Sequence, residues 1–437
     1  MTWQAWATAA IAIGAMAVFA SEKVRADLVA LMVLAALAVL RIIDVNEALA
    51  GFSNEATVTV AAMFVLSLGI ARSGALDPLM LLLARIRRPW LLSLALMLVI
   101  APIGAFVKNT ALVATFLPLA LRVCARTRTS PARVLMPMAF AAQMGGVCTL
   151  LGTSSNLLAD ALARGHGLPG FGVFEFAPLG AVLAVAGIVY MMLVGRWLLP
   201  KSAAVDKAGG GTSAGTASAV HPAYGDSALG GHDDGPHTPR HALIAVAILA
   251  AVVLVSGLRW LPIPLAAVCG AIAMGLAGVF TRHDVYADID WKIIIMLGAI
   301  LPLGIAIEKT GLADVVVHGG IHLIGNHGPF AALLLVYALT ALLTELMGHN
   351  PSVVLMTGIA VSVARALHMD PTAYIVCVAF AAATSFATPV GYPTNTMVYY
   401  AGNYRFTDFM KVGIPLIALF CVLSMLLIPH WWPLTAN

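Results

Sequence analysis

Two short polar segments interrupt long apolar stretches of the chain. The first reads GTSSN at residues 152–156, and the second reads GYPTN at residues 391–395, shortly after Pro389. A proline inside a helix costs about 3 kcal/mol, so the second stretch is not expected to continue as a regular helix. Lipid cannot satisfy the backbone groups that such a break frees, so a break must be packed in protein or line a cavity. Both segments therefore predict interruptions that build a site.

Ion binding is the chemistry that these interruptions allow. A half-helix that begins inside the membrane presents unpaired N–H groups and the positive end of its dipole, which together attract an anion. Carbonyl groups freed at opposite helix ends can coordinate a cation. Asn109 precedes the end of the first segment by 47 residues, and Asn350 precedes the end of the second by 45. Single Gly or Pro kinks are common in helices, but two breaks that are each paired with an asparagine favour a binding site.

Transmembrane helices are the elements that must position these residues. The chain of 437 residues is 61% hydrophobic and only 10% charged, whereas soluble proteins average about 25% charged residues. Apolar runs of about 20 residues recur without the alternation of a β-barrel. The sequence therefore predicts an all-α polytopic membrane protein with about ten spans and two shorter paired segments.

The expected spans fall into two sets of five. The first set is 3–20, 27–41, 56–72, 131–158 and 172–199, and the second is 241–257, 262–280, 291–307, 371–400 and 410–430. Re-entrant hairpins are expected at 89–108/109–124 and at 328–346/351–367. We interpret 3–20 as a retained helix and not a signal peptide, because no Lys or Arg precedes it.

A linker divides the chain into two membrane repeats. Residues 201–240 are rich in Gly, Ser, Ala, Pro and His and lack apolar periodicity, which is typical of a flexible segment. Residues 1–200 are the expected first repeat and 241–437 the second. The halves match at three points: Asn109 and Asn350, Asn156 and Asn395, Gly180 and Gly413, at offsets of 241, 239 and 233. Because each half has five spans, an odd number, the second repeat enters the membrane in the opposite sense to the first. Such inverted repeats are associated with alternating access in secondary transporters.

The distribution of basic residues predicts the orientation. With the N-terminus outside, 18 of the 24 Lys and Arg residues fall on the cytoplasmic side, five fall on the other side, and Lys108 lies within the membrane. This positive-inside pattern predicts an inner (plasma) membrane protein with a cytoplasmic linker and both termini extracytoplasmic. The basic residues are thus explained by topology, and no nucleic-acid partner is expected.

Four stretches resemble the divalent anion/sodium symporter (DASS) family of the ion transporter superfamily. They are GFSNEATVTVAAMFVLSLGIARSGALD (51–77), VKNTALVATFLP (107–118), GGVCTLLGTSSN (145–156), and TSFATPVGYPTN (384–395) with the following MVYYAGNYRFTDF (397–409). The resemblance implies a homodimer whose scaffold domains hold mobile transport domains that work as elevators. It also implies Na⁺ bound beside a dicarboxylate, sulfate or a related oxyanion.

The resemblance and the breaks together select the candidate site residues. The expected substrate-binding residues are Lys108, Asn109, Thr110, Thr153, His349, Asn350, Tyr392 and Pro393. The expected coupling-ion or proton positions are Gly104, Gly152, Asn156, Glu345, Gly391 and Asn395. No cofactor is expected beyond Na⁺ or H⁺ as coupling ion.

Four residues depart from the family pattern. Lys108 and His349 occupy the two Ser positions of the hairpin signatures, Pro351 replaces a Thr, and Glu345 lies one turn before His349. We hypothesise that the Lys108 ammonium replaces one Na⁺ and helps to hold the anion. Glu345 and His349 would then allow proton coupling or exchange. The alternatives are a snorkelling Lys108 and a Glu345 that faces the extracytoplasmic surface.

Other functions are less well supported by the sequence. His318 and His322 are spaced like zinc ligands, but Gly319 and Gly320 weaken a helix there, so a metal site is not expected. The GGG at 209–211 lacks the ending of a phosphate loop. An arsenite or ion antiporter of the same superfamily, an anion channel and a membrane enzyme remain alternatives. An enzyme is disfavoured because no convergent nucleophile or metal cluster is visible.

Overall fold

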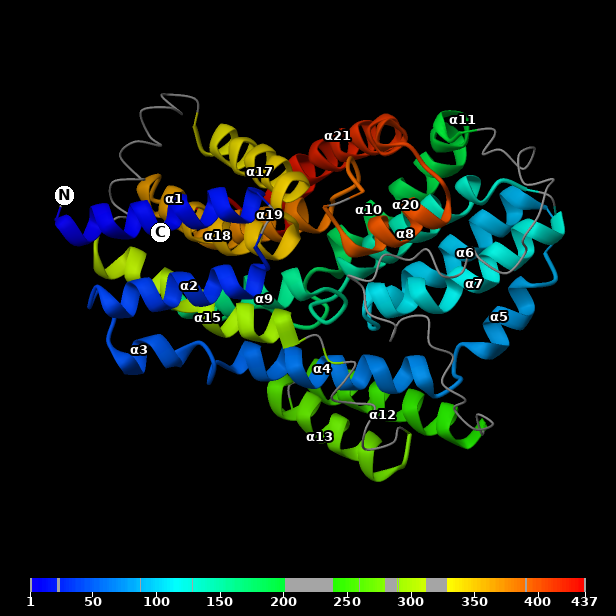
Figure 1. Ribbon diagram of the computed structural model, residues 1–437, viewed down its shortest axis with the longest axis horizontal. Helices are drawn as coiled ribbons and strands as arrows, with labels where there is room; N and C mark the ends of the chain where they lie inside the picture. The colour runs from blue at the N-terminus through cyan, green and yellow to red at the C-terminus, as the bar shows by residue number, and fades with distance from the viewer. Residues whose placement is uncertain are drawn as a thin grey trace.

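A computed structural model of the chain describes residues 2–21, 24–86, 88–127, 129–200, 239–258, 260–279, 289, 291–311, 328–389 and 391–435. The regular elements in these ranges are helices (Figure 1). Most of the expected linker, several of the basic residues counted above, and His318 and His322 lie outside the described residues.

The helices of the first half follow the expected spans closely. They are α1 (Trp3–Ser21), α2 (Ala26–Val39), α3 (Val45–Ala50), α4 (Glu55–Arg72), α5 (Asp77–Leu83), α6 (Pro89–Gly104), α7 (Asn109–Thr127), α8 (Leu135–Gly146), α9 (Ser154–Gly165), α10 (Ala177–Tyr190) and α11 (Arg196–Leu198). A short 3₁₀ helix, η1 (Pro131–Arg133), precedes α8, and a π-helical segment, η2 (Met191–Gly195), joins α10 to α11.

The second half has the same kinds of element. They are α12 (Pro239–Gly257), α13 (Ile263–Leu276), α15 (Trp291–Lys309), α17 (Gly328–Met347), α18 (His349–Ala366), α19 (Pro371–Ala383), α20 (Pro393–Ala401) and α21 (Phe406–Trp431). Five described helices are long and apolar enough to cross a membrane, or six if the bent pair formed by α4 and α5 is one span. Shorter apolar helices occupy several of the other expected spans.

Both expected interruptions are present. α8 ends at Gly146 and α9 begins at Ser154, while α19 ends at Ala383 and α20 begins at Pro393. The residues before α9 and α20, Thr153 and Tyr392, are extended, with φ near −139° and −142°. Pro393 starts α20 because a proline needs no N–H partner in the first turn. The prediction that these spans are broken is confirmed.

The two helical hairpins approach the breaks from different ends of the molecule. In Figure 1, α6 and α7 lie toward the right, whereas α17 and α18 lie toward the left. Gly348 forms the turn between α17 and α18 with φ of 82°, a left-handed conformation that glycine adopts without strain. Both hairpin turns point toward the middle of the molecule, where the breaks lie.

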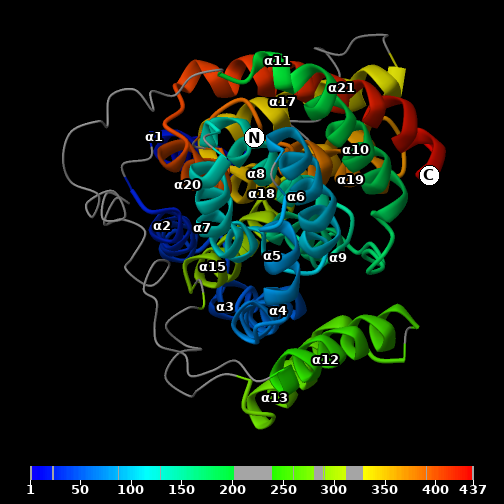
Figure 2. The same cartoon turned by 90° about the vertical axis from the view of Figure 1, so that its right-hand side faces the viewer.

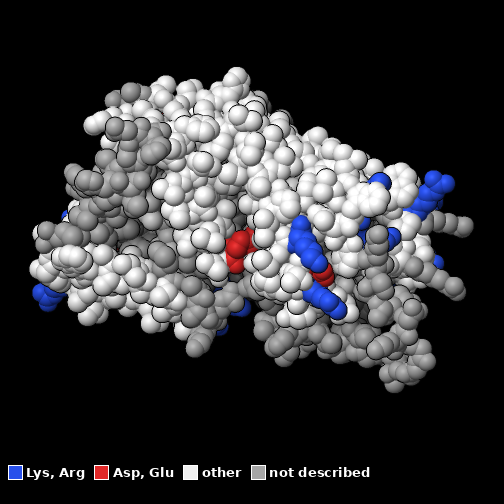
Figure 3. Space-filling model, turned by 90° about the horizontal axis from the view of Figure 1, so that it is seen from above, with Lys and Arg blue, Asp and Glu red and all other residues white. Residues whose placement is uncertain are grey.

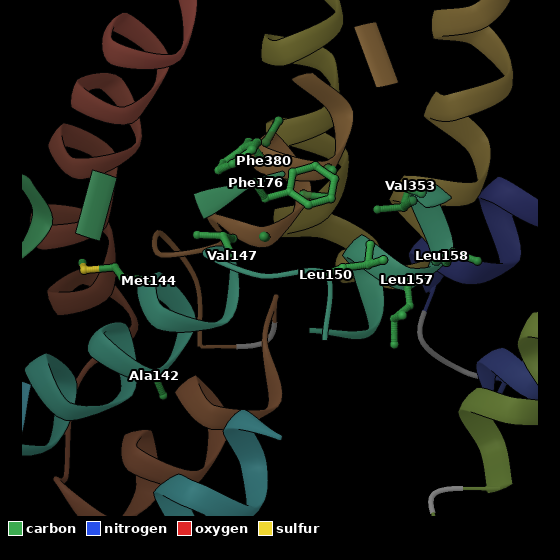
Figure 4. Close-up of a cluster of buried hydrophobic side chains, with 14 of the residues drawn as sticks. Ala142, Met144, Val147, Leu150, Leu157, Leu158, Phe176, Val353 and Phe380 are labelled. Carbon is green, nitrogen blue, oxygen red and sulfur yellow. The ribbon is translucent and has the colours of Figure 1, made fainter. Parts of the chain in front are cut away.

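A continuous apolar core surrounds the breaks. Figure 4 shows Val147 and Leu150 from the first break beside Phe176 and Phe380, whose ring centroids are 5.7 Å apart. α12 and α13 pack against α4 at the periphery, as the side view in Figure 2 shows. The face seen in Figure 3 carries few charged side chains, in keeping with a surface that contacts lipid.

Two glycines allow long helices to press against the breaks. A Cβ at Gly180 of α10 would lie 2.7 Å from the Cα of Cys148, in the first break. A Cβ at Gly413 of α21 would overlap the Phe386 carbonyl in the second. Only glycine permits such approach, so α10 and α21 support the two breaks in the same way.

Candidate functional site

Four described helices begin around one polar cluster. They are α7 at Asn109, α9 at Ser154, α18 at His349 and α20 at Pro393. Tyr392, the residue before α20, accepts a hydrogen bond from Asn109 Nδ2 at 2.9 Å. Its hydroxyl also lies 3.2 Å from Thr153 Oγ1. Tyr392 thus joins the first hairpin turn to both breaks.

The second hairpin closes the other side of the cluster. Ser154 Oγ donates to Asn350 Oδ1 at 2.9 Å and lies 3.4 Å from His349 Nε2. The His349 ring stacks on Tyr392 with centroids 4.3 Å apart and an interplanar angle of 23°. Asn109 and Asn350 are therefore connected through one network, as the sequence predicts.

Three of the helix starts at this cluster have no side-chain cap. The cap residues Thr153, Gly348 and Tyr392 make no side-chain hydrogen bond to the first turns of α9, α18 and α20. Uncapped first-turn N–H groups and the positive ends of the dipoles favour negative charge. The arrangement is suited to binding an anion.

Lys108 adds positive charge next to the cluster. Its backbone N–H donates to Ser67 Oγ of α4 at 2.8 Å, and its ammonium lies 4.0 Å from the centroid of the Phe64 ring. Lys108 therefore lies where the first hairpin turn meets α4, with a cation–π contact that orients its side chain.

One threonine organises the first break. Thr149 Oγ1 accepts the N–H of Gly152 at 3.2 Å and donates to the carbonyl of Ala105, just after α6. Asn156 Nδ2 donates to the Thr149 carbonyl at 2.9 Å. A Cβ at Gly152 would lie 2.5 Å from the Gly146 carbonyl oxygen, so the loop closes tightly at this glycine.

The second break repeats this pattern. Thr388 Oγ1 accepts the N–H of Gly391 at 3.1 Å and donates to the carbonyl of Glu345 at 3.2 Å. Asn395 Nδ2 donates to the Thr388 carbonyl at 3.1 Å. Each break is thus held to the hairpin beside it by a threonine and is closed by an asparagine.

Buried oxygen atoms without hydrogen-bond partners lie near both breaks. Near the first break, Asn109 Oδ1 is unpaired and would lie 3.3 Å from a Cβ at Gly104. Near the second, Glu345 Oε2 and Ser385 Oγ are unpaired, although Glu345 Oε1 accepts the Ala387 N–H at 2.9 Å. Unpaired buried oxygens are costly unless a proton or cation satisfies them.

The remaining predicted residues lie around the same cluster. Thr110 is half-buried in the first turn of α7, and Pro393 is half-buried at the start of α20. Asn109, Thr153 and His349 each contact Tyr392 directly. Ser154 joins Asn350 to this group through its contacts with Asn350 and His349. The roles of these residues remain predictions.

Several residues that build the site are not among those predicted from the sequence. Gln143 of α8 donates to Asn395 Oδ1 at 2.6 Å, and its presence as a lone amide in an apolar helix was a usable signal. Ser154 lies within the GTSSN segment but was not selected. Thr149 and Thr388 are separated by 239 residues, the same offset that relates Asn156 to Asn395. The described residues contain no group of three or more His, Cys, Asp or Glu placed to hold a metal ion.

Comparisons with known proteins identify the family of this chain. Residues 16–379 match the CitMHS family, described as "Citrate transporter". An uncharacterized transporter of Synechocystis is 29% identical over 594 aligned positions, which cover 96% of each chain. A probable sodium/sulfate cotransporter of Chlamydomonas reinhardtii is 31% identical over 168 residues, covering 37% of this chain and 19% of its own.

The fold is also similar to that of a solved transporter. The YdaH transporter of Alcanivorax borkumensis superposes with a TM-score of 0.62 at 16% identity, covering 96% of this chain and 99% of its own. The prediction of a membrane transporter of the ion transporter superfamily is confirmed, and the alternative of an enzyme is not supported. The chain belongs to the CitMHS citrate transporter family and is a secondary transporter.

Proposed function

We propose that this protein carries a small divalent oxyanion across the membrane by alternating access. The observation that carries the proposal is the meeting of four helix N-termini around Asn109, Ser154, His349 and Tyr392. N–H groups aimed at one point favour an anion without requiring a fixed counter-charge. Hydroxyl and amide groups around them orient oxygen atoms of the cargo.

The size of the cluster favours a sulfate-sized cargo over a tricarboxylate. Tyr392 is 4% exposed and His349 8% exposed, and their stacked rings fill space between the helix starts. A tetrahedral oxyanion needs fewer partners than a long dicarboxylate. The sodium/sulfate cotransporters among the relatives support this class, and dicarboxylates are the larger alternative.

Proton coupling or exchange is the proposed energy source. Lys108 supplies a fixed positive charge where a Na⁺ would otherwise balance the anion. Glu345 Oε2 and Ser385 Oγ are unpaired and buried, and a proton on the carboxyl would allow it to donate a hydrogen bond. Neutral oxygens lie near Gly104 and Gly152, namely Asn109 Oδ1 and the carbonyl oxygens of Gly104 and Gly146. They could instead suit a Na⁺, which prefers oxygen ligands as other hard cations do.

Movement would follow an elevator mechanism in a homodimer. The hairpins and broken helices pack together as one block, while α2, α4, α13 and α15 pack with one another beside it. The Lys108 N–H donates to Ser67 Oγ and so joins the first hairpin turn to α4. Such a block could slide with its cargo against a stationary scaffold.

Uptake of labelled sulfate into proteoliposomes tests the proposal. Asn109→Ala and Asn350→Ala should each reduce uptake by about tenfold or more, since a lost charge-assisted hydrogen bond is worth about 1.5–3 kcal/mol. Ser256→Ala in α12 is the matched control, because its hydroxyl bonds only the Val252 carbonyl in the described contacts. Saturable uptake excludes a channel. Wild-type uptake in both asparagine variants would contradict the proposal.

Imposed ion gradients distinguish H⁺ from Na⁺ as the coupling ion. An inward proton gradient, or preloaded internal sulfate, should stimulate uptake in wild type, while a sodium gradient should have little effect. Lys108→Ser, which restores the family's residue at this position, should increase the response to Na⁺. Sodium-dependent uptake in wild type with no response to protons would show that Lys108 does not replace a Na⁺.

A further inference from the structure

A cavity lies far from the polar cluster, at the end of the molecule where α6 begins. It has a volume of about 490 Å³ and is walled by α6, η1, α8, η2 and α11. Most of its wall is apolar, with Leu94, Pro137 and Met192 among the lining residues. None of the transport residues proposed above lines it. A hydrocarbon chain fits such a wall, since each buried CH₂ is favourable.

Positive charge gathers at the mouth of this cavity. Arg133 and Arg196 line it and are both exposed. The first turn of α6 also lies here, and its cap residue Arg88 makes no side-chain hydrogen bond to that turn. Two guanidinium groups and a helix N-terminus present complementary charge to a phosphate.

A buried hydroxyl inside the cavity has no partner in the protein. Ser93 Oγ is among the buried side-chain atoms without a hydrogen bond, and the residue is only 3% exposed. Ser93 lines the cavity one turn into α6. An unpaired buried hydroxyl costs free energy unless a ligand supplies a polar atom. The cavity therefore suits a ligand with one polar group at the basic mouth and a second polar group near Ser93.

Tryptophans beside the mouth indicate the level of the membrane surface. Trp90 and Trp197 line the cavity and are 57% and 66% exposed. Exposed tryptophans are enriched where the bilayer meets water. Arg196 lies over the Trp197 ring at 5.2 Å, which places a cation and an indole together at the same level. The mouth thus combines interfacial aromatics with basic groups.

The cavity depends on an irregular helix. Between α10 and α11 the chain forms the π-helical segment Met191–Gly195. π segments are rare and often occur at functional sites. Here the wider turn places Met191 and Met192 on the cavity wall and Arg196 at its mouth. A local departure from α-helix thus contributes both apolar and basic groups to one cavity.

We propose that this cavity binds an anionic phospholipid. Its phosphate lies between Arg133, Arg196 and the start of α6, and an ester or glycerol oxygen pairs with Ser93. One acyl chain follows the apolar wall inward. The positive-inside distribution assigns this end to the cytoplasmic leaflet. The bound lipid would tie the first hairpin to the end of α10, a helix that packs against α8 of the first break.

Lipid titration by native mass spectrometry of the detergent-purified chain tests this proposal. Dioleoyl phosphatidylglycerol should bind with saturation, whereas dioleoyl phosphatidylcholine should bind far more weakly. The double variant R133Q/R196Q should lower the affinity for phosphatidylglycerol roughly thirtyfold, because two basic contacts are lost. The matched control, R122Q/R126Q, removes two exposed arginines from the end of α7 with the same change in charge and should bind like wild type.

Ser93→Ala provides a second test that does not depend on surface charge. Since Ser93 Oγ has no partner in the protein, its removal should leave the thermal stability of lipid-free protein unchanged or raised. The same change should weaken phosphatidylglycerol binding several-fold. Equal binding of phosphatidylcholine, equal thermal stabilisation by inorganic phosphate alone, or equal loss in R122Q/R126Q would overturn the proposal. Unchanged phosphatidylglycerol affinity in Ser93→Ala would overturn it too.

Discussion

Tyr392 connects most of the polar groups at the candidate site. Its hydroxyl contacts Asn109 and Thr153, and its ring stacks on His349. The position follows from the break, because the extended backbone at Tyr392 directs its side chain back toward the first hairpin. The proposed role of Tyr392 predicts effects on both stability and cargo binding, so the two effects need separate readouts.

Tyr392→Phe should weaken both properties. Loss of the hydroxyl leaves Asn109 Nδ2 buried without an acceptor, which costs about 1–3 kcal/mol of unfolding free energy. The misplaced Asn109 amide should also raise the KM for sulfate uptake. Tyr190→Phe is the control, since it loses one hydrogen bond to the Val412 carbonyl, at 2.9 Å, away from the site. It should lower thermal stability and leave KM unchanged, and the same KM in both variants would argue against a role for Tyr392.

Glu345→Gln should separate binding from coupling. Glutamine keeps an oxygen that can accept the Ala387 N–H but cannot gain or lose a proton at that position. We expect sulfate counterflow to persist while stimulation by a proton gradient disappears. Glu175→Gln is the control, because Glu175 accepts the Gly172 N–H in a surface loop. Normal proton-driven uptake in Glu345→Gln would exclude this carboxyl as the proton carrier.

At the level of elements, the two breaks share one construction. A threonine ties each loop to the hairpin beside it, an asparagine closes it, and a glycine on α10 or α21 permits close packing. Two of the three pairs matched in the sequence belong to this construction, namely Asn156 with Asn395 and Gly180 with Gly413. The opposite orientation of the halves in a membrane stays a prediction.

The sequence predicted the elements better than the contacts between them. Hydropathy located the helices, and glycine with proline located the breaks, because both signals act locally. The stacking of His349 on Tyr392 and the bond from Gln143 to Asn395 join residues 43 and 252 positions apart. No local pattern reports such pairs, since they depend on how whole helices pack. The cavity at η2 was missed for the same reason.

Gly152→Ala tests how tightly the first break is closed. The added Cβ would lie 2.5 Å from the Gly146 oxygen and 2.8 Å from the Gly104 oxygen, both backbone atoms that cannot rotate away. We expect a loss of about 1–3 kcal/mol in unfolding free energy and a strong loss of sulfate uptake. Gly165→Ala at the end of α9 meets no atom within 4 Å and should be tolerated. Tolerance of both changes would mean that the loop is looser than described.

At the level of the whole molecule, the two halves are joined at the surface as well as at the site. Lys309 at the end of α15 donates to Glu47 of α3 at 2.8 Å. The hydrogen bond with Lys309, followed by that from the Asp44 N–H, lowers the pKa of the Glu47 carboxyl below 4.5. This contact is exposed, so its contribution to stability is expected to be small.

The Glu47 contact predicts a defined pH dependence. Because the folded-state pKa is lowered, its stabilisation is present above the unfolded pKa of 4.5 and is lost as pH falls through the folded value. The difference in melting temperature between wild type and Glu47→Gln should therefore shrink on acidification. Lys309→Gln should reproduce most of this behaviour. A difference that is constant from neutral to acidic pH would contradict the assignment.

The buried bonds between the halves have a consequence for biogenesis. Asn109 pairs with Tyr392, Gln143 with Asn395, and the Met136 N–H with the Tyr404 hydroxyl, across 283, 252 and 268 residues. Ribosomes add about 5–20 residues per second. The polar groups of the first half, on Asn109, Met136 and Gln143, therefore remain unpaired in the bilayer for many seconds before their partners are synthesised. A nascent chain arrested before Thr388 would expose them, and membrane proteases and insertion chaperones would meet it in that state.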